Sequence, residues 1–146
     1  MCWVDVWAIE HLLARRDAGS LRDDDVRKAV GLYRGVFLAG EEGEIPQATA
    51  LADGLRRRLL RQINQLARQH EATDGARAAE WYEEALRIDP CAEDTCRLLM
   101  RAYHQLGRRA AVADVYGRCR SALATHLGGI PSPETERLFK SLSAAS

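Results

Sequence analysis

The chain has little lysine and no excess of charge of either sign. Of its 146 residues, twenty-one are Lys or Arg and twenty-one are Asp or Glu, so the formal net charge is zero. A domain whose main task is to bind nucleic acid is usually plainly basic, and the balance argues against that class. The only lysines are Lys28 and Lys140. Arginine holds carboxylates and phosphates through a planar fork, but genomic base composition produces the same bias.

Long apolar segments and disulfide patterns are also missing. No apolar run approaches the ~18–20 residues that a membrane helix needs, and the first residues lack the basic and apolar regions of a signal peptide. A helical chain of this length does not depend on disulfides. We therefore expect a cytoplasmic protein with reduced thiols and no membrane attachment, and a chain that begins within a longer protein. The four cysteines form no Cys-x-x-Cys pair: Cys2, Cys91, Cys96 and Cys119.

The sequence carries no catalytic or metal-binding motif. Its histidines have no i,i+4 pair and no cysteine at ligand spacing. A Gly-rich phosphate loop, a nucleophile elbow and a Ser-His-Asp grouping are all absent, and Gly128-Gly129 is interpreted as a helix cap. We expect no enzymatic activity, no metal and no cofactor. The histidines are His11, His70, His104 and His126.

One pattern of side chains occurs twice at a fixed spacing. The period of thirty-four residues is that of tetratricopeptide arrays. Small residues let two helices approach closely, and an aromatic residue one turn later fills the gap between helix pairs. The pattern predicts an all-α fold, a right-handed α-α superhelix of tetratricopeptide-like helical hairpins. The first copy is Ala78, Tyr82 and Ala85; the second is Val112, Tyr116 and Cys119; between them run Cys96, Leu99, Met100 and Tyr103.

Apolar periodicity and capping residues predict about seven helices and no strand. Asp89 is expected to cap the fifth helix with Pro90 at its first position, and Ser132 to cap the seventh. The segment Gly35–Ala48 is irregular, and Phe37 and Leu38 are expected to pin it to the body. The expected helices span 5–16, 23–33, 47–71, 75–88, 90–105, 108–126 and 133 onward. We predict one domain over 1–146, with an N-terminal helical pair over 1–34, a repeat core over 47–127 and a capping helix within 128–146.

The chain resembles the bacterial transcriptional activator domain, the tetratricopeptide-like module beside the DNA-binding domain in antibiotic-regulatory-type regulators. Four segments carry the match. The last is the most specific, because a helix end, the string Pro131-Ser132-Pro133-Glu134-Thr135 and a closing helix rarely occur in this order by chance. Nothing in the chain resembles the winged-helix domain that such regulators place upstream. The segments are Val4-Asp5-Val6, Tyr33-Arg34-Gly35-x-x-Leu38, Ala85-Leu86-x-x-Asp89-Pro90 running on to Gly107-Arg108, and Tyr116 through Ile130-Pro131-Ser132-Pro133-Glu134-Thr135.

The resemblance implies a non-enzymatic effector domain that acts through protein contacts in transcriptional control. It would mediate homodimerisation, contact an RNA polymerase subunit, or relay a signal to the regulator's own DNA-binding domain. DNA binding is then implied only for the parent protein. Two alternatives remain open: a ligand-sensing repeat domain that binds a small anion or nucleotide, and a general peptide-binding scaffold.

Two arginine-bearing surfaces are candidate interaction sites. In tetratricopeptide repeats the first helix of each pair lines the concave groove, and a cationic groove holds an acidic peptide or a terminal carboxylate. The candidate groove residues are Asp94, Arg97, Arg101, His104 and Gln105. The second set, expected to lie near phosphates or DNA, is Arg56, Arg57, Arg58 and Arg61. An ordinary solvated helix face is the alternative for both. Trp3 and Trp7 either pack internally or face a neighbouring domain.

Overall fold

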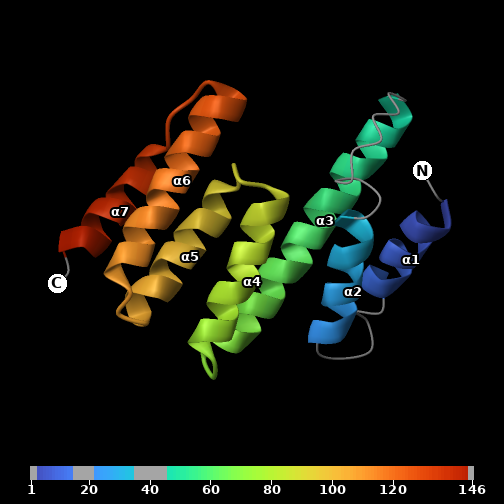
Figure 1. The fold of residues 1–146 in the computed structure, drawn as a ribbon, viewed down its shortest axis with the longest axis horizontal. Coiled ribbons are helices and arrows are strands. Elements are labelled where there is room, and N and C mark those ends of the chain that lie inside the picture. Colours follow the sequence, from blue (N-terminus) through green and yellow to red (C-terminus); the bar gives the residue numbers. More distant parts are fainter. Residues whose placement is uncertain (1–2, 15–21, 35–45, 145–146) are drawn as a thin grey trace. The chain divides into compact units, whose positions relative to one another are not determined.

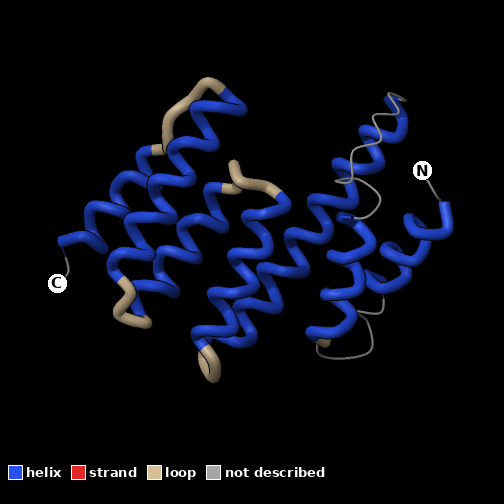
Figure 2. The backbone as a smooth tube through the Cα atoms, in the orientation of Figure 1, coloured by secondary structure: helices blue, strands red, loops and turns tan. Residues whose placement is uncertain are grey.

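The computed structural model describes residues 3–14, 22–34 and 46–144, and this part of the chain forms helices without any strand (Figures 1 and 2). The predicted all-α class is confirmed. The seven helices of these ranges are α1 (Trp3–Ala14), α2 (Asp23–Tyr33), α3 (Pro46–Glu71), α4 (Gly75–Ile88), α5 (Glu93–Gln105), α6 (Arg109–Leu127) and α7 (Pro133–Ala144). The prediction that Phe37 and Leu38 pin a loop lies outside the described residues. No helix within the described ranges is long and apolar enough to cross a membrane.

The start of α5 differs from the sequence prediction. Asp89 does not cap α5; it ends α4 in an extended conformation with φ −137° and ψ 94°. Its Oδ1 accepts a hydrogen bond from the backbone N of Cys91 at 3.0 Å, which places Pro90 in the turn. An Asp side chain that bonds the backbone two residues on forms an Asx-type turn. The helix therefore begins at Glu93, three residues later than predicted.

The chain divides into two compact units, Met1–Leu66 and Ala67–Ser146, with the boundary inside α3. In the first unit α1 packs against α2. The core of this unit draws on α1, α2 and α3 at the three- and four-residue spacing of amphipathic helices. Its buried apolar residues are Ile9, Val26, Ala29, Val30, Tyr33, Leu55, Leu59, Ile63 and Leu66.

The second unit contains the repeat. Within it α5 packs against α4 and α6, and α7 contacts both α5 and α6 (Figure 1). Ala78, Tyr82 and Ala85 are fully buried, as the spacing predicts for residues between packed helices. The hydroxyl of Tyr82 reaches the end of α3 and donates to Oε1 of Glu71 at 2.6 Å. The other buried members of the repeated pattern are Cys96, Leu99, Met100, Val112 and Cys119.

Helix α7 packs against α5 and α6. The ring of Phe139 stacks on that of Tyr116 in α6, with centroids 4.0 Å apart and planes 4° from parallel. Ser132 caps α7 as predicted, since its Oγ accepts from the backbone N of Thr135 at 3.4 Å. Gly128 ends α6 in the left-handed conformation, with φ 61° and ψ 25°. The predicted C-terminal cap of α6 is confirmed.

Candidate interaction surfaces

The predicted groove residues on α5 divide into two groups in the structure. Arg97 turns toward α7, and its side chain is only 11% exposed. Its Nη1 donates to Oγ1 of Thr135 at 2.9 Å, and its Nη2 pairs with Asp94 and lies 3.7 Å from Oε2 of Glu134. The guanidinium is therefore committed to contacts inside the domain and is not available to bind a partner.

Glu93 completes this cluster at the first turn of α5. Its Oε2 accepts from the Oγ1 of Thr135 at 2.6 Å and from the backbone N of Ser132 at 2.9 Å. Burial alone would raise the pKa of Glu93, but the hydrogen bonds from Thr135 and Ser132 and the charge of Arg97 lower it overall. The carboxylate is thus the form that this cluster stabilises, and it joins the start of α5 to the start of α7.

A second cluster joins α4, α5 and α6. Arg118 of α6 donates from Nη1 to Oε2 and from Nη2 to Oε1 of Glu83 in α4, each at 2.9 Å. The hydroxyl of Tyr103 in α5 donates to the same Oε1 at 2.7 Å. Such a bidentate arginine–carboxylate pair fixes the relative orientation of the two side chains in addition to pairing their charges. Burial and the hydrogen bond to Glu83 raise the pKa of Tyr103 to about 12.

Between these clusters, α5 presents the remaining predicted groove residues. Asp94, Arg101 and Gln105 are exposed and His104 is half-buried. Within the described residues, Arg101 forms no hydrogen bond or ion pair. Because Glu93, Arg97 and Tyr103 tie α5 to its neighbours, the helix is a rigid support for these side chains. The prediction that they bind a partner remains a prediction.

Sequence reasoning missed both clusters, because their members come from different helices. Thr135 lies 42 positions from Glu93, and Arg118 lies 35 from Glu83. Helical spacing relates only residues three or four apart. The one local signal is the Ser132 cap, which places Thr135 three residues later, in the first turn of α7.

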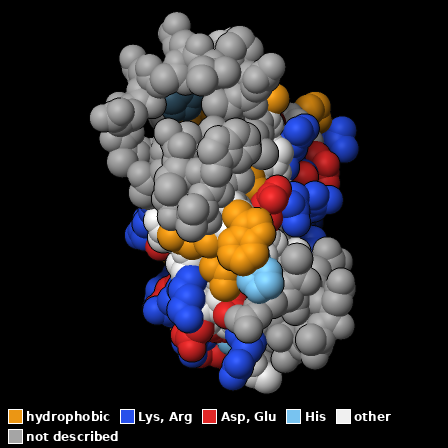
Figure 3. Space-filling model, turned by 90° about the vertical axis from the view of Figure 1, so that its right-hand side faces the viewer, with side chains coloured by type: hydrophobic (Ala, Val, Ile, Leu, Met, Phe, Trp, Pro, Cys, Tyr) orange, Lys and Arg blue, Asp and Glu red, His pale blue; other side chains and the backbone are white. Residues whose placement is uncertain are grey.

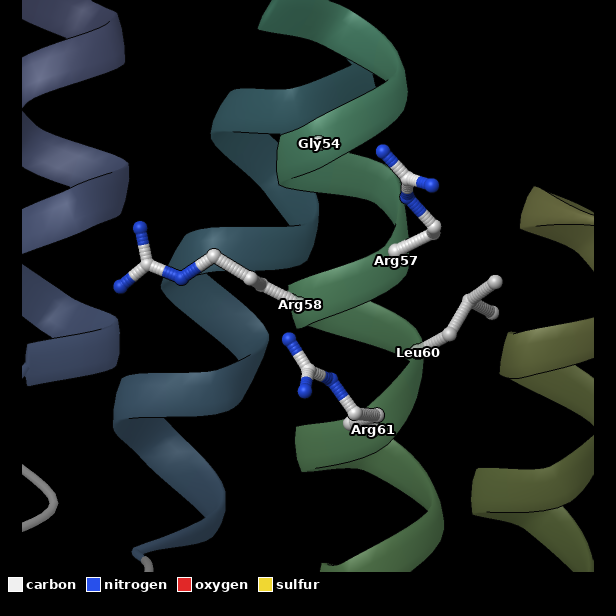
Figure 4. Close-up of a pocket in the computed structure, with 5 residues that line it drawn as sticks. All are labelled: Gly54, Arg57, Arg58, Leu60 and Arg61. Carbon is white, nitrogen blue, oxygen red and sulfur yellow. The ribbon is translucent and has the colours of Figure 1, made fainter.

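The arginines of α3 belong to the first unit, and the structure separates them. Arg56 pairs with Asp53 at 3.1 Å, and Arg58 lies 3.8 Å from Oε1 of Glu10 in α1. In the part of the chain that the structure describes, Arg57 and Arg61 have no ion-pair partner. Three of these arginines line an open hollow of about 660 Å³ (Figure 4). Its lining residues are Gly54, Arg57, Arg58, Leu60 and Arg61.

Exposed apolar side chains lie in both units. Trp7 of α1 is 63% exposed, and its ring stacks on His11 with centroids 5.1 Å apart. On the side of α1, hydrophobic and histidine side chains adjoin at the surface (Figure 3). Trp7 thus does not pack in the core, whereas Trp81 is buried. The side chain of Trp3 lies outside the described residues. In the second unit Leu127 is exposed at the last residue of α6, and Ile130 is exposed in the turn that follows.

Comparison with known proteins identifies one family. A family model described as bacterial transcriptional activator domain matches residues 4–143, nearly the whole chain. No curated protein and no solved structure matches the chain. The family match agrees with the resemblance carried by the motifs from Val4 to Thr135.

Proposed function

Because the chain belongs to the bacterial transcriptional activator domain family, we propose that it is an effector domain that contacts a protein partner through the exposed face of α5. The family supports the coarse function, a domain of transcriptional activators. The finer function is the proposal: α5 recognises an acidic segment of a partner in the transcription machinery. An RNA polymerase subunit, the regulator's DNA-binding domain and a second protomer are the partner classes that the family suggests.

The observation that carries this proposal is the contrast between Arg97 and Arg101. Both are arginines on α5, one turn apart, but Arg97 is held by Thr135 and Asp94 whereas Arg101 is exposed and unpaired within the described residues. An unpaired guanidinium on a rigid helix binds a carboxylate with little loss of order in the protein. Arg101 is therefore the central residue of the proposed contact, and Gln105 is its neighbour one turn on.

The test is a binding measurement with purified bacterial RNA polymerase holoenzyme and the Arg101→Glu variant of this chain. Charge reversal at an exposed position should leave the fold intact, as circular dichroism would verify, and should weaken binding. Arg120→Glu, at an exposed site on α6, is the matched control and should bind like the wild type. Light scattering of the wild type and the two variants measures their oligomeric state, and so tests whether the partner is a second protomer.

Two results would count against the proposal. Equal binding by wild type and Arg101→Glu, to polymerase and to a second protomer, would remove the α5 contact. Nucleotide that raises the melting temperature of the wild-type chain, in the absence of protein binding, would favour the ligand-sensing alternative, because a ligand of the native state must stabilise it.

A further inference from the structure

We propose that the arginine hollow on α3 is an accessory contact for the phosphate backbone of double-stranded DNA. The hollow is lined by Arg57, Arg58 and Arg61 with Gly54 and Leu60. This inference rests on membership of a transcription-regulator family, but not on the proposed contact of α5. The zero net charge of the whole chain does not exclude a nucleic-acid contact, because acidic and basic residues are not evenly distributed along it.

The charged residues of α3 around the hollow are nearly all basic. From Gly54 to His70 the helix has no acidic residue and five arginines, although the whole chain has zero net charge. Asp53 is already paired with Arg56, and Glu10 lies 3.8 Å from Arg58. Arg57 and Arg61 thus keep uncompensated charge within the described residues, which favours an anionic partner.

The geometry allows an extended anion to approach. Arg57 and Arg61 are four residues apart and lie on the same side of α3, with Gly54 about one turn before them. A Cβ atom placed on Gly54 would meet nothing within 4 Å, so the described residues leave the space beside Gly54 open. The three guanidinium groups fan out over the helix and do not converge on one point (Figure 4). Diverging groups suit several phosphates along a chain better than a single ion.

The openness of the hollow argues against a small-molecule site. Pockets for small ligands enclose most of the ligand and are lined largely by apolar side chains. Among the described residues, one helix supplies the lining, and Leu60 is the only large apolar side chain in it. Contacts between arginine and backbone phosphates tolerate solvent, since their free energy comes largely from released counterions.

The experiment measures binding of a fluorescent random-sequence DNA duplex to the 146-residue chain by anisotropy at increasing salt, starting at about 20 mM because such contacts weaken with salt. The variant is Arg57→Gln with Arg61→Gln. The matched control is Arg109→Gln with Arg120→Gln, which removes the same charge from exposed positions of α6. Glutamine keeps a helix propensity close to that of arginine, so both variants should fold.

We expect the wild type and the α6 control to bind alike and the α3 variant to bind more weakly. The slope of log Kobs against log salt should become shallower by about 1.8 in the α3 variant, at about 0.9 for each phosphate that is no longer neutralised. Equal weakening by both variants would show a general effect of charge and overturn the proposal. A wild type that binds inorganic pyrophosphate by calorimetry but not the duplex would overturn it as well, by showing a small-anion site.

Discussion

Arg97 of α5 donates a hydrogen bond to the hydroxyl of Thr135 in α7 at 2.9 Å, across 38 positions of sequence. Thr135 is fully buried, and its hydroxyl passes the hydrogen bond on to Glu93 at 2.6 Å. The cation, the hydroxyl and the carboxylate form a hydrogen-bond relay that joins α7 to α5. A residue that helical spacing places in a binding groove therefore has a structural role.

Thr135→Val should destabilise the protein by about 1–3 kcal/mol, because it removes one hydroxyl that satisfies both Arg97 and Glu93. Valine has nearly the same shape, so the measured change reports hydrogen bonding and not side-chain volume. Urea denaturation followed by circular dichroism gives the change, as a lower midpoint with an unchanged m-value. Ser141→Ala, at an exposed position of the same helix, is the control. A midpoint for Thr135→Val equal to that of the control would contradict the relay.

The relay also predicts how stability depends on pH. The pKa of Glu93 is lowered in the folded protein from its usual 4.5, so the unfolded chain takes up a proton more readily. The stabilisation is therefore complete above about pH 4.5 and is lost as the pH falls through the lower folded pKa. Glu93→Gln should give a shallower loss of stability than the wild type in this window, measured as urea midpoints. Identical slopes would show that the carboxylate gains nothing from its partners.

The same logic extends to Glu83. Burial alone would raise its pKa, but hydrogen bonds from Arg118 and Tyr103 lower it. Combining Glu83→Gln with Glu93→Gln should remove more of the acid dependence than either change alone. Because the two carboxylates accept hydrogen bonds from different residues, we expect their contributions to the pH dependence of the unfolding free energy to add.

The repeat core could be predicted from the sequence because its signal is local and periodic. Small and aromatic residues at three- and four-residue spacing mark Ala78, Tyr82 and Ala85, and all three are buried. Helix ends with a local chemical cause, such as Ser132 and Gly128, were also predictable. The family followed from motifs that are continuous in sequence.

The candidate sites were less predictable, because side-chain partners depend on which helices meet. Spacing on α5 groups Arg97 with Arg101, but the packing of α7 takes Arg97 away from the surface. Spacing on α3 likewise does not reveal that Asp53 pairs with Arg56, whereas Arg57 has no ion-pair partner among the described residues. The prediction that Asp89 caps α5 was wrong for another reason. Its side-chain oxygen accepts a hydrogen bond from the backbone N of Cys91 in a turn, so that oxygen does not cap the helix.

The ring of Tyr82 tests the repeat itself. It is fully buried, and its hydroxyl donates to Glu71. Tyr82→Ala should cost about 3–5 kcal/mol of unfolding free energy, through reduced apolar burial and a cavity. Tyr82→Phe keeps the ring and should cost only about 1 kcal/mol, the usual value of one hydrogen bond. Denaturant midpoints that barely move for Tyr82→Ala would mean that the repeat register is wrong.

Alanine substitutions at the two glycines after α6 distinguish the cost of backbone strain from the cost of side-chain packing. Gly128 has φ 61°, whereas Gly129 does not adopt positive φ, and a Cβ on either would meet nothing within 4 Å. Gly128→Ala should therefore cost about 1–2 kcal/mol from left-handed backbone strain alone, and Gly129→Ala should be nearly neutral. Thermal unfolding of the two variants gives the comparison. Equal melting temperatures would mean that the turn relaxes without cost, and that Gly128 is not needed to end α6 and direct the chain toward α7.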